Sequence, residues 1–194
     1  KDRREGMMGP LYGYQWRFFN AKYDDTTGKP LNKGIDQLKL VIDTIRNDPY
    51  SRRIMMTDFN PEQAMDGVLY PCHSIILQFY VSDCNLDMYC YNRSQDVFLG
   101  TPFNIASSAL LLTFVAKITN LIPRYLHMGL GDVHVYKEHY EQVKEQVNRS
   151  PYFFPQLILK KDIKEILDLE RLNYTDISLQ EYNFYPIIKA DMIA

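Results

Sequence analysis

Two strand-like runs in the middle of the chain, residues 74–81 and 86–93, are separated by only four residues, Ser82-Asp83-Cys84-Asn85. Each run is rich in aromatic and branched apolar residues, and polar residues fill the gap between them. Because so short a polar connection cannot cross over a sheet, the two runs are predicted to form an antiparallel hairpin. Any fold for this chain must contain that pair.

Helical periodicity appears on both sides of the hairpin. Apolar residues from Ile35 to Ile45 recur at helical spacing, and Asn47-Asp48-Pro49 ends the pattern. Pro102 suits a first helical turn, and a helix to about Thr119 is expected, mostly buried. A half-exposed helix is predicted at 135–148, and further strands at 53–57, 126–130, 156–160 and 185–189. The sequence therefore predicts the α+β class, with a mixed sheet and flanking helices in one domain over residues 1–194.

Composition narrows the classes of partner. The 194 residues are 46% hydrophobic and carry a net charge of −2, without a Lys/Arg block, so neither DNA nor a membrane surface is expected as a partner. The longest apolar run, 106–118, is interrupted by hydroxyl residues and Lys117, so no bilayer span is expected. Three cysteines without a CxxC spacing favour a reduced, cytoplasmic compartment, with a nuclear or organellar one also open.

Cys72 is the candidate nucleophile. It follows Pro71 at the start of an apolar run, although free cysteines are often simply buried. His73 would point to the opposite face of a strand, so nearby arginines, rather than His73, are expected to lower the thiol pKa. Cys84 and Cys90 are interpreted as structural.

Cations and hydroxyls suggest an anion site. Arg52 and Arg53 immediately precede a predicted strand, and Arg93 and Ser94 end another. Guanidinium groups bind phosphate through paired donors. The alternative is that the arginine pair is ordinary solvated surface.

Further polar side chains suit a heterocycle and a sugar. Asp96 and Asn104 flank a glycine-containing turn, and an amide can donate and accept at once on a uracil edge. Their plainer interpretation is a turn Asp and a helix-entry Asn. His134 and Tyr136 could bind a sugar hydroxyl or simply form an aromatic cluster.

Five blocks, in order, resemble the thymidylate synthase family. They are Gly9-Pro10-Leu11-Tyr12-Gly13-Tyr14-Gln15-Trp16-Arg17, Asp48-Pro49-Tyr50-Ser51-Arg52-Arg53, Pro71-Cys72-His73 with Gln78-Phe79-Tyr80-Val81, residues 93–107, and Gly131-Asp132-Val133-His134-Val135-Tyr136. The resemblance covers nearly the whole chain. It implies reductive methylation of dUMP to dTMP by 5,10-methylenetetrahydrofolate, giving dihydrofolate, with no metal.

The resemblance also implies residue roles. Cys72 would add to C6 of the uracil, Asn104 would read the base, and Tyr12 would order the proton-transfer network. The folate would meet Asp96 and Gly100. The remaining expected dUMP ligands are Arg52, Arg53, Arg93, Ser94, His134 and Tyr136. The family is a homodimer with sheets packed face to face, in which Arg52 and Arg53 would reach the partner's site.

Several positions depart from the family pattern. The family's Gln before Arg-Ser is Asn92, the Trp before Asn-Pro is Phe59, and a His near the C-terminus is Tyr185. The family's N-terminal segment, with a Glu for proton transfer and a phosphate-loop Arg, is not found here, and a fused dihydrofolate reductase upstream is one expectation for a longer chain. Two alternatives are a relative that modifies dCMP, which Asn104 disfavours, and a non-catalytic homologue acting as a structural or RNA-binding partner.

Overall fold

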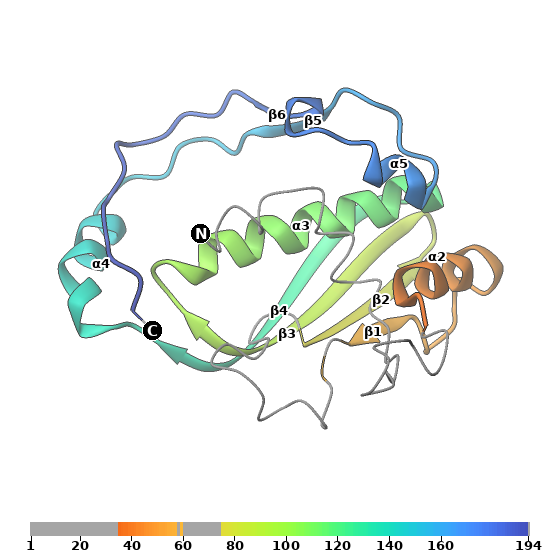
Figure 1. Ribbon diagram of the computed structural model, residues 1–194, viewed down its shortest axis with the longest axis horizontal. Helices are drawn as coiled ribbons and strands as arrows, with labels where there is room; N and C mark the ends of the chain where they lie inside the picture. Colours follow the sequence, from red (N-terminus) through yellow and green to blue (C-terminus); the bar gives the residue numbers. More distant parts are fainter. Residues whose placement is uncertain (1–34, 58, 60–74, 194) are drawn as a thin grey trace, which may run out of the picture.

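The chain forms a four-stranded mixed sheet with helices packed on one face (Figure 1). The computed structural model describes residues 35–57, 59 and 75–193. The strand order is β1-β2-β3-β4, where β1 is Met55–Thr57, β2 is Ile76–Ser82, β3 is Asn85–Asp96 and β4 is Ile122–His134. The first two pairings are antiparallel and β3–β4 is parallel, so the sheet is mixed, as predicted.

The predicted hairpin is confirmed. Strands β2 and β3 pair from Ile76–Tyr91 to Ser82–Asn85, which leaves a two-residue turn. Asp83 in that turn has φ 54°, a left-handed conformation that Asp tolerates better than most residues. Cys84 is exposed in the same turn.

Helix α2, Gln37–Asn47, covers the β1 side of the sheet. Asp36 caps its first turn by accepting a hydrogen bond from the Lys39 backbone N–H at 2.9 Å, and Pro49 follows its end. Its buried residues recur at helical spacing: Leu38, Val41, Ile42 and Ile45. The sequence-based helix is therefore confirmed, with its apolar face against the core.

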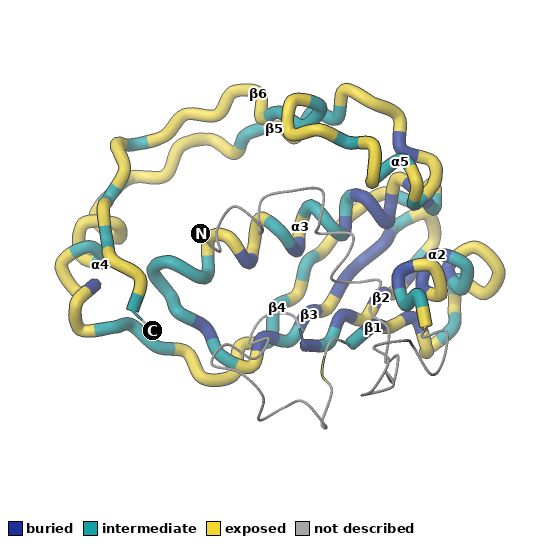
Figure 2. The backbone as a smooth tube through the Cα atoms, viewed as in Figure 1, coloured by how far each residue is buried: buried dark blue, intermediate teal, exposed yellow. Residues whose placement is uncertain are grey.

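Helix α3, Gly100–Thr119, lies across β3 and β4 (Figure 1). It begins two residues before Pro102, and Asn120 ends it in a left-handed conformation with φ 57°. Only its second half is well buried, while Phe103 is 70% exposed, so the prediction of a mostly buried helix is wrong for its first half (Figure 2). By length and composition alone α3 could cross a membrane; here its second half packs into the core instead.

The core lies between the sheet and the two long helices. Alternate residues of β2 and β3 are almost fully covered, and they meet the second half of α3 and the apolar face of α2 (Figure 2). The central members are Leu77, Phe79, Leu86, Met88, Val115 and Ala116. This packing holds the first half of β3 and the second half of α3 together.

The last third of the chain forms a thin arch. After the 3-10 turn η3, Lys137–His139, and the short helix α4, Tyr140–Val147, the chain runs through β5, Gln156–Leu159. Helix α5, Ile166–Glu170, and the 3-10 turn η4, Tyr174–Asp176, then lead to β6, Ile177–Gln180, which pairs with β5. Most of this arch is exposed (Figure 2).

Two sequence-based elements need correction here. The helix predicted over 135–148 is shorter, because Val135 and Tyr136 lie outside any helix and η3 precedes α4. The strand predicted at 185–189 is wrong: those residues have no regular structure, and β5 pairs with the unpredicted β6 instead.

Candidate functional site

Most of the predicted site residues that the structure describes gather where β3 and β4 end and α3 begins. Because β3 and β4 are parallel, their carboxyl ends lie at the same edge of the sheet. The register places Ser94 beside Asp132 and Asp96 beside His134, and the Val97 backbone N–H donates to the His134 carbonyl oxygen at 3.0 Å. We call this edge the β3–β4 rim.

Asp96 shapes the turn between β3 and α3. Its Oδ1 accepts hydrogen bonds from the backbone N–H groups of Phe98 and Leu99, at 3.0 and 3.4 Å. The expected turn role of Asp96 is thus confirmed. Its other oxygen, Oδ2, makes no hydrogen bond within the described residues. A ligand with N–H groups would fit that carboxylate oxygen.

Gly100 begins α3 close to two of these side chains. A Cβ built on Gly100 would meet Asp96 Cβ and Gln95 Nε2, both at 3.4 Å. Those are ordinary contacts, so the glycine is not required by crowding within the described chain. Its place in the candidate folate site remains a prediction.

Asn104 is buried in the first turn and a half of α3, with 9% of its surface exposed. Its Nδ2 donates to Oε1 of Gln95 at 3.3 Å. A buried amide at the rim, already held by a second amide, is a defined hydrogen-bonding group rather than a solvated helix-entry residue. The interpretation of Asn104 as a plain helix-entry residue is therefore disfavoured, and its role in reading the base stays a prediction.

His134 and Tyr136 form part of an aromatic cluster. Their rings meet edge to face at 5.0 Å, and Tyr136 also meets the ring of His139 at 5.7 Å. The Nδ1 atom of His134 is buried without a hydrogen bond to the described residues and lies 3.7 Å from Asp132 Oδ1. The cluster interpretation is confirmed, and it leaves polar atoms at the rim for a ligand.

The cations occupy two separate places. Arg93 is exposed on β3 just before the rim. Arg52 and Arg53 are exposed in the turn before β1, where Met55 pairs with Gln78, which in turn pairs with Tyr89. Tyr89 precedes Arg93 by four residues, so the arginine pair lies at least roughly 13 Å back along the strands. One chain therefore does not bring these arginines to its own rim.

None of these three guanidinium groups makes a hydrogen bond or ion pair within the described residues. The positive charge of these exposed arginines is not neutralised by a carboxylate of the described chain, so the arginines are available to bind an external anion. By contrast, Arg124 and Arg149 are both held by carboxylates of the chain.

Cys90 is confirmed as a structural cysteine. It is fully buried on β3, and that burial raises the pKa of its thiol, while the Ser108 hydroxyl lowers it to a lesser extent. A neutral buried thiol is a poor nucleophile. Cys72 and Tyr12, the predicted nucleophile and proton-network residue, lie outside the described residues.

Sequence reasoning missed the amide cluster behind the rim. Asn92 and Gln95 are both fully buried, and the Asn92 Nδ2 donates to Gln95 Oε1 at 2.7 Å. Asn92 could have been found, because it continues the inward-facing series of Met88 and Cys90. Gln95 could not, because strict alternation would put Ser94 inside in its place.

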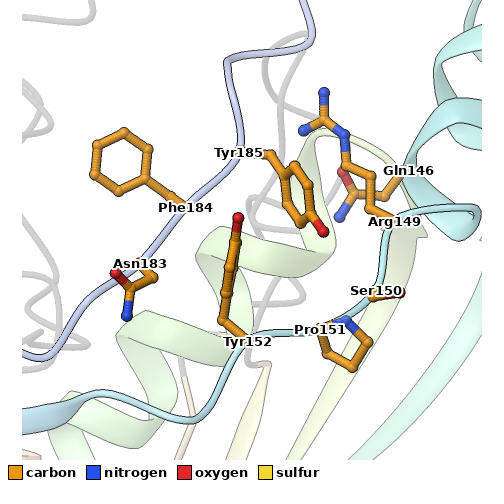
Figure 3. Close-up of a pocket in the computed structure, with 8 residues that line it drawn as sticks. All are labelled: Gln146, Arg149, Ser150, Pro151, Tyr152, Asn183, Phe184 and Tyr185. Atoms are coloured by element: carbon orange, nitrogen blue, oxygen red, sulfur yellow. The ribbon is translucent and has the colours of Figure 1, made fainter.

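A surface hollow of about 330 Å³ lies elsewhere, between the end of α4 and the C-terminal segment (Figure 3). In it the rings of Tyr152 and Tyr185 face one another at 4.8 Å, and the Arg149 guanidinium lies over the Tyr185 ring at 5.2 Å. Among the predicted site residues that the structure describes, none lines this hollow.

The fold and rim define a class: an α+β domain whose sheet edge combines a buried amide, a carboxylate and a nearby cation. Comparison with known proteins specifies the family. The sequence profile described as thymidylate synthase matches residues 2–194. The chain belongs to the thymidylate synthase family.

Individual relatives agree. The chain is 45% identical to the thymidylate synthase of Saccharomyces cerevisiae, over 99% of this chain and 65% of that protein. It is 43% identical to the Homo sapiens thymidylate synthase, over 98% of this chain and 59% of that one. A bifunctional dihydrofolate reductase-thymidylate synthase of Plasmodium chabaudi is 44% identical over 99% of this chain and 32% of its own length. The chain thus spans about three-fifths of the length of the yeast and human relatives.

Proposed function

We propose that the protein containing this chain is a thymidylate synthase that converts dUMP to dTMP, with 5,10-methylenetetrahydrofolate as donor of the one-carbon unit and the hydride. Family membership over residues 2–194 supports the reaction. The single structural observation that carries it is the buried Asn104 amide at a rim shared with Asp96 and His134.

The proposed roles follow from chemistry. The Cys72 thiolate adds to C6 of the uracil, which makes C5 a carbon nucleophile for the methylene group. Asn104 donates to O4 and accepts from N3–H, so it holds the base and stabilises charge that develops on O4. Tyr12 orders the proton-transfer network. Hydride and methylene both come from the folate. The protein supplies the Cys72 thiolate, which leaves C6 again after C5 has lost its proton, and otherwise positions the reactants, moves protons and excludes water.

Ligand groups are assigned to the remaining side chains by type. Arg93 and Ser94 bind the 5′-phosphate, and the His134–Tyr136 pair holds the 3′-hydroxyl. Asp96, whose Oδ2 has no hydrogen bond within the described residues, accepts from N–H groups of the pterin beside Gly100. The donor set contains oxygen and nitrogen groups suited to organic ligands, and within the described residues no cluster of metal-binding side chains occurs.

A homodimer completes the proposed site. The sheet face opposite α2 and α3 presents a cross-strand row, Met55–Gln78–Tyr89–His127, in which Met55 and Tyr89 are each 43% exposed. Tyr80 on the same face is 65% exposed. A two-fold contact through this face would bury that apolar surface, and Arg52 and Arg53 would serve the partner's phosphate site.

The test is turnover by the full-length protein. Tritium release from [5-³H]dUMP, dependent on 5,10-methylenetetrahydrofolate and accompanied by dihydrofolate absorbance, is the expected result. Tight dUMP binding without turnover would favour the non-catalytic alternative, and preferential turnover of dCMP would favour the other relative. We place the reaction in the cytoplasm, which fractionation of the source cells would check.

A further inference from the structure

Gln95 occupies the centre of the buried amide cluster behind the rim. It is fully buried between β3 and α3. Its Oε1 accepts from Asn92 Nδ2 at 2.7 Å and from Asn104 Nδ2 at 3.3 Å. Its Nε2 donates to Thr101 Oγ1 at 2.9 Å and to the Asp96 carbonyl oxygen at 3.3 Å. Gln95 therefore joins the end of the strand to the first turn of the helix.

The direction of the hydrogen bonds that Gln95 makes follows from one backbone group. The Asp96 carbonyl oxygen can only accept, and it takes the single hydroxyl hydrogen of Thr101 at 3.1 Å. The Thr101 oxygen then has only lone pairs to offer, so Gln95 must present its amide nitrogen to it. Gln95 Oε1 is thereby directed to the other side, where Asn104 must present its own nitrogen.

We propose that Gln95 is a positioning residue that fixes the order of nitrogen and oxygen on the Asn104 amide, and through it the preference for a uracil over a cytosine edge. This inference rests on the proposed function. If the Asn104 amide turned over, its Oδ1 would face Gln95 Oε1 inside the core, oxygen against oxygen. The native order keeps the Asn104 N–H donor in place for uracil O4 and the Asn104 oxygen in place for uracil N3–H. Cytosine presents a donor at position 4 and an acceptor at N3, so it does not match this order.

Asn92 strengthens this arrangement. It is also fully buried, and the Cys90 thiol lies 3.8 Å from its Oδ1, in donor geometry. Its Nδ2 makes the shorter of the two bonds to Gln95 Oε1, so it holds that oxygen in place independently of Asn104. Asn92 is one methylene shorter than the family's Gln at this position. Its partner at position 95, Gln95, is a longer amide.

The decisive variant is Thr101→Val, which removes the hydroxyl that orients Gln95 and leaves Asn104 intact. In the full-length protein, we expect the preference for dUMP over dCMP to fall on the order of tenfold. This preference is measured as the ratio of the kcat/KM values for dUMP and dCMP, and as the ratio of the dissociation constants for dCMP and dUMP. Thr101→Ser keeps the hydroxyl and should restore the wild-type ratio. Gln95→Leu, which removes both ends of the amide, should lower the ratio at least as far.

Thr113→Val is the matched control, because Thr113 lies on the same helix and its hydroxyl donates to the Ala109 carbonyl oxygen at 2.9 Å, away from the amide cluster. It should leave the ratio unchanged. A Thr101→Val ratio within about twofold of the wild-type value would overturn the inference, even if dUMP turnover establishes the proposed function. A wild-type protein that binds neither nucleotide would overturn both.

A second readout needs no nucleotide. The Asn104 side-chain amide should give one sharp ¹⁵N–¹H pair in the wild-type protein, assigned by its loss in Asn104→Asp. In Thr101→Val it should broaden or double as the amide samples both orders. A single unshifted pair in that variant would also contradict the role of Gln95.

Discussion

Asp87 and Arg124 join two parallel strands through a pair of hydrogen bonds. Arg124 Nε donates to Asp87 Oδ1 at 2.9 Å, and Arg124 Nη2 donates to Oδ2 at 2.7 Å. The Tyr125 backbone N–H adds a third bond to Oδ1 at 3.0 Å. The β3–β4 register shifts between Leu86 and Met88, so this pair ties the two strands together where the regular backbone ladder is interrupted.

The first prediction is that this pair makes folding stability fall in acid. Arg124's hydrogen bond holds the pKa of Asp87 below its ordinary value of 3.8, although burial acts in the opposite direction. A lowered folded-state pKa contributes stability above about pH 4, and that contribution disappears as the pH falls through the lowered pKa. Asp87→Asn should therefore lower the urea midpoint at pH 7, and the difference between the two proteins should shrink as the pH falls from 4 towards 2.

Asp162→Asn provides the control for that experiment. Asp162 pairs with Lys164, and both side chains are more than two-thirds exposed, so water and salt screen the pair. Its urea midpoint should stay near the wild-type value at both pH values. Equal losses in Asp87→Asn and Asp162→Asn would show that general surface charge, rather than the Asp87 pair, sets the acid response.

The second prediction concerns Cys72. Cys72→Ser should reduce turnover by on the order of 10³-fold or more, because a neutral hydroxyl is a far weaker nucleophile than a thiolate. Phosphate and base contacts remain, so the dissociation constant for dUMP should change by no more than about threefold. Cys90→Ser, at a buried thiol, is the comparison and should cost stability instead of chemistry. A serine variant that kept most of its rate would remove Cys72 from the nucleophile's role.

The third prediction concerns base choice at Asn104 itself. Asn104→Asp should narrow the preference for dUMP over dCMP, since a protonated carboxyl can match the cytosine edge where the amide cannot. Each mismatched buried group costs about 1–3 kcal/mol, which sets the size of the expected change in the ratio of kcat/KM values. An unchanged ratio would mean that another group reads the base, and the substrate assignment would then rest on the family alone.

Local patterns predicted the centre of the fold well. The two apolar runs at 74–81 and 86–93, with their short polar connection, predict the hairpin. The structure buries one face of each strand in the core, including Leu77, Phe79 and Met88. The beginning of α3 was predicted two residues late, because the Asp96 carboxylate that caps the turn lies before Pro102 and accepts from Phe98 and Leu99. Pro102 alone could not show that.

Non-local pairing explains the errors. Apolar residues near Tyr185 resemble a strand, but a strand needs a neighbour, and β5 pairs with Ile177–Gln180. Likewise the site residues were predicted singly, by type, while Gln95 acts through contacts with Thr101 and Asn104 six and nine residues away. Gln95 and Thr101 lie within the block 93–107, but neither residue type indicates a chemistry by itself, so only their three-dimensional contacts reveal their role.

The last prediction tests whether Arg52 and Arg53 act across a dimer interface. They lie on the turn before β1, away from the rim of their own chain, and they have no ion-pair partner within the described residues. A protein carrying Arg52→Ala and Arg53→Ala should be nearly inactive, and so should Cys72→Ser. Mixed dimers should regain activity, because one of their two sites combines an intact Cys72 with the partner's intact arginines. Random exchange of equal amounts should restore about a quarter of the wild-type rate per chain, as two-fold symmetry requires.

Recovery should develop only after the dimers are dissociated and reassociated, with simple mixing as the control. If the arginines served their own chain's site, no mixed dimer would hold a complete site on the Cys72→Ser chain or on the arginine variant, and the mixture would stay as inactive as its parents.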